Sequence, residues 1–126
     1  MNLAYVDTSA LVAIAFGERG ASALARKLEE YDGLLSSNLL KAELRGAFVR
    51  EGVQGADDLL TWITWVLPNR PLTREIKAVL EAGYLRGADL WHLACALYVA
   101  GRPDNLTFIS LDERQQGIAQ ILGFSS

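Results

Sequence analysis

The sequence has little of what several classes of protein depend on. It contains one cysteine and one histidine, which excludes an internal disulfide and leaves no set of Cys and His ligands for zinc. Its longest uninterrupted apolar stretch, Leu93 to Ala100, is far too short to span a bilayer, and no basic leader precedes the first strand-like run. We therefore expect a cytoplasmic protein with no membrane segment and no redox chemistry, in which Cys95 is an inert buried thiol.

Basic charge is also scarce. The chain has 12 Lys and Arg residues against 15 Asp and Glu residues, a net charge of -3, whereas proteins that grip nucleic acid by bulk electrostatics are usually basic. The negative net charge therefore argues against a protein that binds nucleic acid. This argument weakens if several acids hold divalent cations, because a bound metal reverses the local sign of the charge and attracts phosphate. The positions of the acids therefore decide what the net charge means.

The 126 residues are 51% apolar, enough for one sizeable core, and we expect a single domain over residues 1–126. Four β-like runs can be marked: Leu3 to Val6, Gly33 to Ser36, a weak one at Val66 to Leu72, and Thr107 to Ser110. Helical patterns separate them: Ser9 to Phe16, Ala21 to Tyr31, Leu39 to Arg50, Ala56 to Trp65, Thr73 to Tyr84 and Asp89 to Ala100, with Glu113 to Leu122 at the end. This alternation predicts an α/β/α sandwich with a short, mainly parallel central sheet. Pro68 and Pro71 place the weak third strand at an edge, or make it very short, because proline cannot donate to the ladder.

Four carboxylates are expected to converge in this fold. Asp7 directly follows the first strand and Asp112 follows the last, and ligands of a parallel α/β sheet collect at the carboxyl ends of its strands. Helical periodicity puts Glu43 on the inward side of its helix and Asp89 on the inward side of another, with no Lys or Arg one turn away in its own helix. Because unpaired buried carboxylates are costly, their convergence favours a site for a hard cation with oxygen ligands.

Each residue also has a purely structural interpretation. Asp7, Asp89 or Asp112 could cap a helix, Asp112 with Gln115 forming a capping box, and Glu43 could extend from the edge of its apolar stripe to water. Thr8 and Ser9 are second-tier site residues whose hydroxyls could orient water or touch a phosphate oxygen, although Ser9 could instead cap the first helix. His92, one turn after Asp89, is more typical of a packed, hydrogen-bonded side chain than of a ligand.

The motifs that carry these acids resemble those of the PIN-domain ribonucleases, in particular the VapC-type toxins of toxin-antitoxin pairs. They are "YVDTSAL", "SNLLKAELRGAF", "LRGADLWHLACAL" and "TFISLDERQQGIAQILGF", and they extend over nearly the whole chain. The resemblance implies cleavage of RNA that depends on Mg²⁺ or Mn²⁺. It also implies Asp7 and Asp89 as direct metal ligands, with Asp112 and Glu43 completing the cluster directly or through water.

The resemblance further implies a cognate VapB-type antitoxin and favours a homodimer. Lys41, Arg45 and Arg86 lie in the same motifs and could contact phosphates, or could simply be solvated surface residues. The apolar side of the helix from Asp89 to Ala100 that carries Trp91 fits either a partner surface or packing within the chain.

Other classes of function fit the sequence less well. A phosphoacceptor signalling module would need a lysine at a later strand end, but every lysine lies in a helical pattern. A catalytically inactive PIN-like module that binds RNA or protein is harder to separate, because it would keep the same residues. Only activity that depends on Asp7 or Asp89 distinguishes it from a nuclease.

Overall fold

A four-stranded parallel sheet with helices on both faces organises the chain, and the computed structural model describes residues 1–126. The strands are β1 (Leu3–Val6), β2 (Gly33–Ser37), β3 (Ile63–Val66) and β4 (Leu106–Ile109), in the order β3-β2-β1-β4. Tyr5 lies opposite Leu35 on one side and opposite Phe108 on the other, which places β1 and β2 in the centre. The predicted α/β/α sandwich is confirmed, with a sheet that is wholly parallel.

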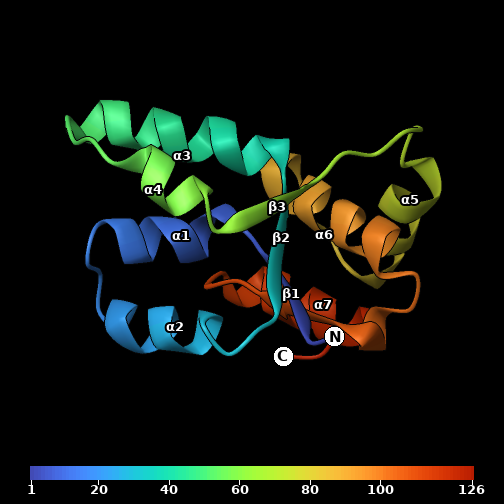
Figure 1. The fold of residues 1–126 in the computed structure, drawn as a ribbon. Helices are drawn as coiled ribbons and strands as arrows, with labels where there is room; N and C mark the ends of the chain where they lie inside the picture. The colour runs from blue at the N-terminus through green and yellow to red at the C-terminus, as the bar shows by residue number, and fades with distance from the viewer.

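Seven helices and one short 3-10 turn connect the strands. They are α1 (Thr8–Ala15), α2 (Ala21–Leu28), α3 (Asn38–Glu51), α4 (Ala56–Leu60), α5 (Thr73–Ala82), α6 (Gly87–Ala100), η1 (Pro103–Asn105) and α7 (Glu113–Leu122). Figure 1 shows α1 to α4 on one side of the sheet and α5 to α7 on the other, with the two chain ends close together. No helix combines the length and the apolar character needed to cross a membrane.

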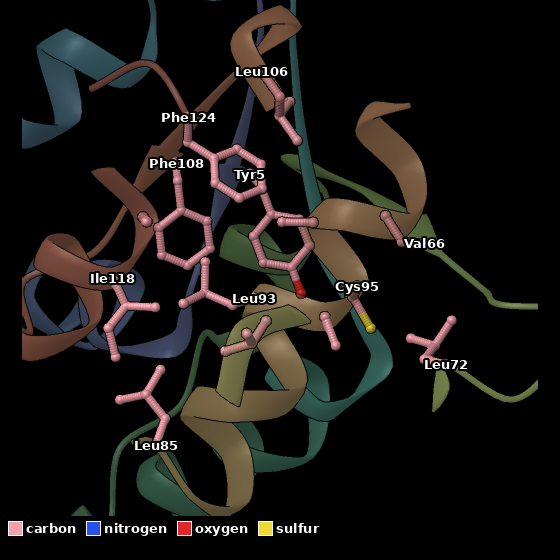
Figure 2. Packing of buried hydrophobic residues seen from close by; sticks show 14 residues of the cluster. Tyr5, Val66, Leu72, Leu85, Leu93, Cys95, Leu106, Phe108, Ile118 and Phe124 are labelled. Atoms are coloured by element: carbon pink, nitrogen blue, oxygen red, sulfur yellow. The ribbon is translucent and has the colours of Figure 1, made fainter. Parts of the chain in front are cut away.

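Residues of the central strands alternate between the two faces of the sheet, and each face carries its own apolar cluster. Ala4 and Val6 of β1 pack in a cluster of 13 buried residues with helices α1 to α4, whereas Tyr5 packs in one of 14 with α5 to α7. The second cluster surrounds Tyr5 with Phe108, Leu93 and Cys95 (Figure 2). Because both faces are covered to a similar extent, the strands are buried as in other parallel sheets. The expected burial of Cys95 is confirmed, and burial raises the pKa of its thiol to about 12, which disfavours the reactive thiolate.

The third strand is the main correction to the sequence analysis. The structure ends α4 at Leu60 and forms β3 at Ile63–Val66, where a helix to Trp65 and a strand from Val66 to Leu72 were predicted. Leu59, Trp62 and Ile63 recur at helical spacing and so suggested a helix. The segment "ITWV" is β-branched and aromatic, however, and it pairs in parallel with β2 from Leu34 onward. Of the two alternatives expected for the third strand, the edge position is confirmed, and the prolines lie beyond the strand.

Candidate active site at the carboxyl edge of the sheet

Asp7 occupies the end of β1 and is almost completely buried, with 2% of its surface exposed. It caps α1 by accepting a hydrogen bond from the amide of Ala10, so the capping interpretation holds for Asp7 and not for Ser9. Ser9 lies inside the helix, where its hydroxyl donates to Oδ1 of Asp7 at 2.6 Å. Oδ2 lies 2.9 Å from the hydroxyl of Ser110. Burial raises the pKa of Asp7, and these hydrogen bonds oppose that rise.

Asp112 lies three residues beyond β4 and caps α7, accepting the amide hydrogen of Gln115 at 2.8 Å. The predicted capping box is only half formed, because the Gln115 side chain does not return to the backbone of Asp112. Instead Gln115 is fully buried, with Oε1 2.6 Å from the hydroxyl of Ser110 and Nε2 donating to the backbone carbonyl of Asp89 at 3.1 Å. Gln115 thereby ties the start of α7 to the end of β4 and to the start of α6.

Asp89 lies in the first turn of α6, which begins at Gly87, two residues earlier than predicted. It makes no capping hydrogen bond, so the capping interpretation is wrong for this residue. Burial raises the pKa of Asp89, and the negative charges of Asp112 and Glu43 raise it further, whereas His92 lowers it. Asp89 is therefore close enough to Asp112 and to Glu43 for their negative charges to act on it.

Glu43 projects from α3 towards α1 and α6, with 34% of its side chain exposed. Its Oε1 accepts a hydrogen bond from the hydroxyl of Thr8 at 2.6 Å and lies 3.4 Å from Nε2 of His92. The contact with His92 lowers the pKa of Glu43, burial raises it, and the hydrogen bond from Thr8 lowers it again. Glu43 is thus held in place and does not simply extend to water.

The structure places Asp7 after β1 and Asp112 after β4, with Asp89 and Glu43 on α6 and α3, but it brings no three of these acids together as a group that could hold a metal. The hydroxyl of Thr8 donates to Glu43, and that of Ser9 donates to Asp7. None of the four forms an ion pair with Lys or Arg: the only cationic partner is His92, if protonated, opposite Glu43. Among the basic candidates, Arg45 pairs with Asp57, and Lys41 lies over the ring of Trp65. Arg86 is exposed immediately before α6 and makes no ion pair.

Sequence reasoning missed Tyr5 and Ser110 and gave Gln115 only a capping role. These three side chains are buried polar groups, and every buried side-chain nitrogen and oxygen atom has a hydrogen-bond partner. A signal for Ser110 existed in its position between a buried strand and Asp112. Tyr5 gave no signal, because an aromatic residue in a central strand is ordinary core.

Comparison with known families was decisive, since the sequence profile of the PIN domain matches residues 4–121. The chain belongs to the PIN domain family. PIN domains are generally nucleases, and they generally use divalent metal ions. The match includes all four acids and every strand residue except Leu3, so the edge described above is the candidate active site of this PIN domain. The comparison with curated proteins gave no match.

Removing the hydroxyl of Ser9 should raise the pKa of Asp7 further. The hydroxyl donates to the ionised carboxylate and so lowers that pKa, and Ser9→Ala leaves burial as the dominant influence. A carboxyl NMR titration of Asp7 measures the shift. Ser22→Ala, an exposed serine on α2, serves as the control and should leave the titration unchanged. An unaltered Asp7 titration in Ser9→Ala would contradict the assigned hydrogen bond.

Proposed function

We propose that this PIN domain is an endoribonuclease that depends on Mg²⁺ or Mn²⁺. One observation supports the proposal: none of the four acids has a Lys or Arg partner, and the charges of Asp112 and Glu43 act on Asp89. The negative charges of Asp112 and Glu43 repel the ionised form of Asp89, a repulsion that is unfavourable in the protein alone. A divalent cation bound among them relieves it.

The donor set fits a hard cation. All four side chains offer carboxylate oxygens, and the one cysteine, Cys95, is buried in the apolar cluster around Tyr5 and is not among them. No three Asp, Glu, His or Cys side chains lie together as a complete ligand set. That arrangement is compatible with Mg²⁺, which usually keeps several waters and takes one or two carboxylates together with phosphate oxygens of the substrate. We assign Asp7 and Asp89 as the direct ligands, with Asp112 and Glu43 acting directly or through water.

A bound divalent cation would lower the pKa of water and neutralise charge on the phosphate oxygens of the scissile bond. The residues of the chain supply the positioning. Ser9 and Ser110 hold the two oxygens of Asp7, and Thr8 holds Glu43. Arg86 is exposed next to the start of α6 and is free to bind a phosphate of the RNA, which compensates for the acidic surroundings.

We further propose that the nuclease is the toxin of a toxin-antitoxin pair. The similarity of its four motifs to those of VapC-type toxins supports this role, and it suggests a VapB-type antitoxin and a homodimer. Several large apolar side chains are exposed and are available for a partner, among them Trp62, Leu80 and Tyr84.

Purified protein free of antitoxin should cut a labelled RNA mixture when Mg²⁺ or Mn²⁺ is present and should stop when EDTA is added. Asp7→Asn should abolish the cutting. Asparagine caps helices as well as aspartate does, so the variant can keep the α1 cap through its amide oxygen. It removes the negative charge and puts an amide donor where the second oxygen of Asp7 faces Ser110. The proposal would be contradicted if the wild-type protein cut no RNA and bound no metal in calorimetry. RNA that is bound but not cut would point to an inactive binding module.

A further inference from the structure

A row of hydrogen-bonded side chains, mostly buried, links the central strand β1 through α6 to Glu43. The hydroxyl of Tyr5 lies 2.8 Å from Nδ1 of His92, and both residues are almost wholly buried. Nε2 of His92 lies 3.2 Å from Oγ1 of Thr8 and 3.4 Å from Oε1 of Glu43. Figure 2 shows the hydroxyl of Tyr5 directed away from Leu106 and Phe124, towards α6.

The donor and the acceptor of each hydrogen bond in this row of side chains can be assigned. The backbone amide of Ser37 donates to the hydroxyl oxygen of Tyr5 at 3.1 Å, so the hydroxyl proton of Tyr5 is left to be donated elsewhere. Burial raises the pKa of Tyr5, and the phenol keeps that proton. Nδ1 of His92, 2.8 Å away, accepts it. The hydrogen of a neutral His92 ring then resides on Nε2, the nitrogen that faces Glu43.

The two oxygens of Glu43 are used unequally. Oε1 accepts from Thr8 and faces Nε2 of His92, whereas Oε2 has no hydrogen bond within the protein. Donors on one oxygen fix the plane of the carboxylate, and the other oxygen stays available to a cation or to water around it. Carboxylate ligands in metal sites are commonly oriented by such partners.

We propose that Tyr5 and His92 are positioning residues: the Tyr5 hydroxyl sets the Nε2–H form of His92, and His92 with Thr8 then orients Glu43 for a divalent cation. The inference rests on the proposed metal-dependent function and adds two residues to its site. Neither residue touches the substrate or the cation. Their proposed effect on the reaction passes through the orientation of Glu43.

Two substitutions at position 92 separate positioning from packing. In His92→Gln the amide nitrogen can take the place of Nε2 and still donate to Glu43, although the acceptor for Tyr5 is lost. In His92→Asn the amide oxygen can accept from Tyr5, but the shorter side chain no longer reaches Glu43. We expect Mn²⁺ affinity, measured by calorimetry, to stay within a few-fold of wild type in His92→Gln and to fall roughly 10–100-fold in His92→Asn.

A second measurement tests the tautomer without any metal. His92 is the only histidine in the chain, so ¹H–¹⁵N correlations of the imidazole ring need no assignment. We expect the pattern of hydrogen on Nε2 in the metal-free wild type, and a mixture of both forms in Tyr5→Phe. Hydrogen on Nδ1 in the wild type would overturn the proposed order of donors.

The outcomes distinguish this inference from the function it rests on. Mn²⁺ binding to the wild type, with equal affinity in His92→Gln and His92→Asn, would overturn the positioning role and leave the nuclease proposal intact. No Mn²⁺ binding by the wild type would overturn the metal-dependent function, and the role of Glu43 towards a cation would fall with it. In that case the ring spectrum would still decide whether Tyr5 sets the form of His92.

Discussion

Replacing Asp89 with asparagine should abolish RNA cleavage while leaving the protein at least as stable at neutral pH. Asp89 is assigned as a direct cation ligand, and metal stabilisation of a phosphoryl transition state is worth several kcal/mol. The expected loss in cleavage rate is therefore about 10³-fold. A cleavage assay at saturating Mn²⁺, with the variant and wild type at equal concentration, measures it.

The stability half of this prediction follows from the pKa of Asp89. Burial and the charges of Asp112 and Glu43 raise that pKa in the folded state, so the folded protein holds the proton more tightly than the unfolded chain. The contribution of Asp89 to the free energy of unfolding is complete below the unfolded pKa, about 4, and is lost as pH rises through the folded value. Asparagine cannot ionise, so the variant should escape this loss. Urea unfolding from about pH 4 to neutrality tests the difference.

Metal should act on the wild type alone. A ligand that binds only the folded state at 100 times its dissociation constant adds about 2.7 kcal/mol, so Mn²⁺ should raise the melting temperature of the wild type and not that of Asp89→Asn. Asp58→Asn is the matched control, because Asp58 is exposed on α4 and forms no ion pair. It should keep wild-type cleavage. An Asp89→Asn protein that cuts RNA at more than a tenth of the wild-type rate would contradict the assigned role.

The two strand-end acids could be placed in advance because one rule governs them. Strands that all run in one direction end at one edge, so the residues after β1 and β4, Asp7 and Asp112, had to emerge together once the sheet was predicted to be parallel. Helical periodicity likewise predicted that Glu43 lies on the inward side of its helix. The positions of these acids follow from the parallel order of the strands and from the helical repeat of apolar residues, and both can be read from the sequence.

The contacts between the acids and their supporting groups could not be placed in the same way. Tyr5 and His92 are 87 positions apart, and Ser110 and Asp7 are 103 apart, so neither pair follows from local pattern. The third strand was predicted at the wrong position for a different reason. "ITWV" follows a helical stripe of apolar residues, and a short apolar run has no period of its own, so only its pairing with β2 decides that it is a strand.

Truncating Leu93 should cause the largest loss of stability among these predictions. Leu93 is fully buried in α6 and packs in the cluster that contains Tyr5 and Phe108 (Figure 2). Leu93→Ala removes buried methyl groups and leaves a cavity, which should lower the free energy of unfolding by about 2–5 kcal/mol. The melting temperature should fall on the order of 10 °C. Chemical and thermal unfolding, followed by circular dichroism, measure both.

The matched control for this effect is Leu80→Ala on α5, where 44% of the side chain is exposed. Its effect should stay within about 0.5 kcal/mol of zero, as is usual for surface sites. Leu93 adjoins His92 in sequence, yet it makes none of the hydrogen bonds that orient Glu43. Leu93→Ala should therefore keep its Mn²⁺ affinity well below its melting temperature, whereas His92→Asn should lose it. Equal loss of affinity in the two variants would mean that core packing of α6, and not the His92 hydrogen bond, sets the position of the carboxylate.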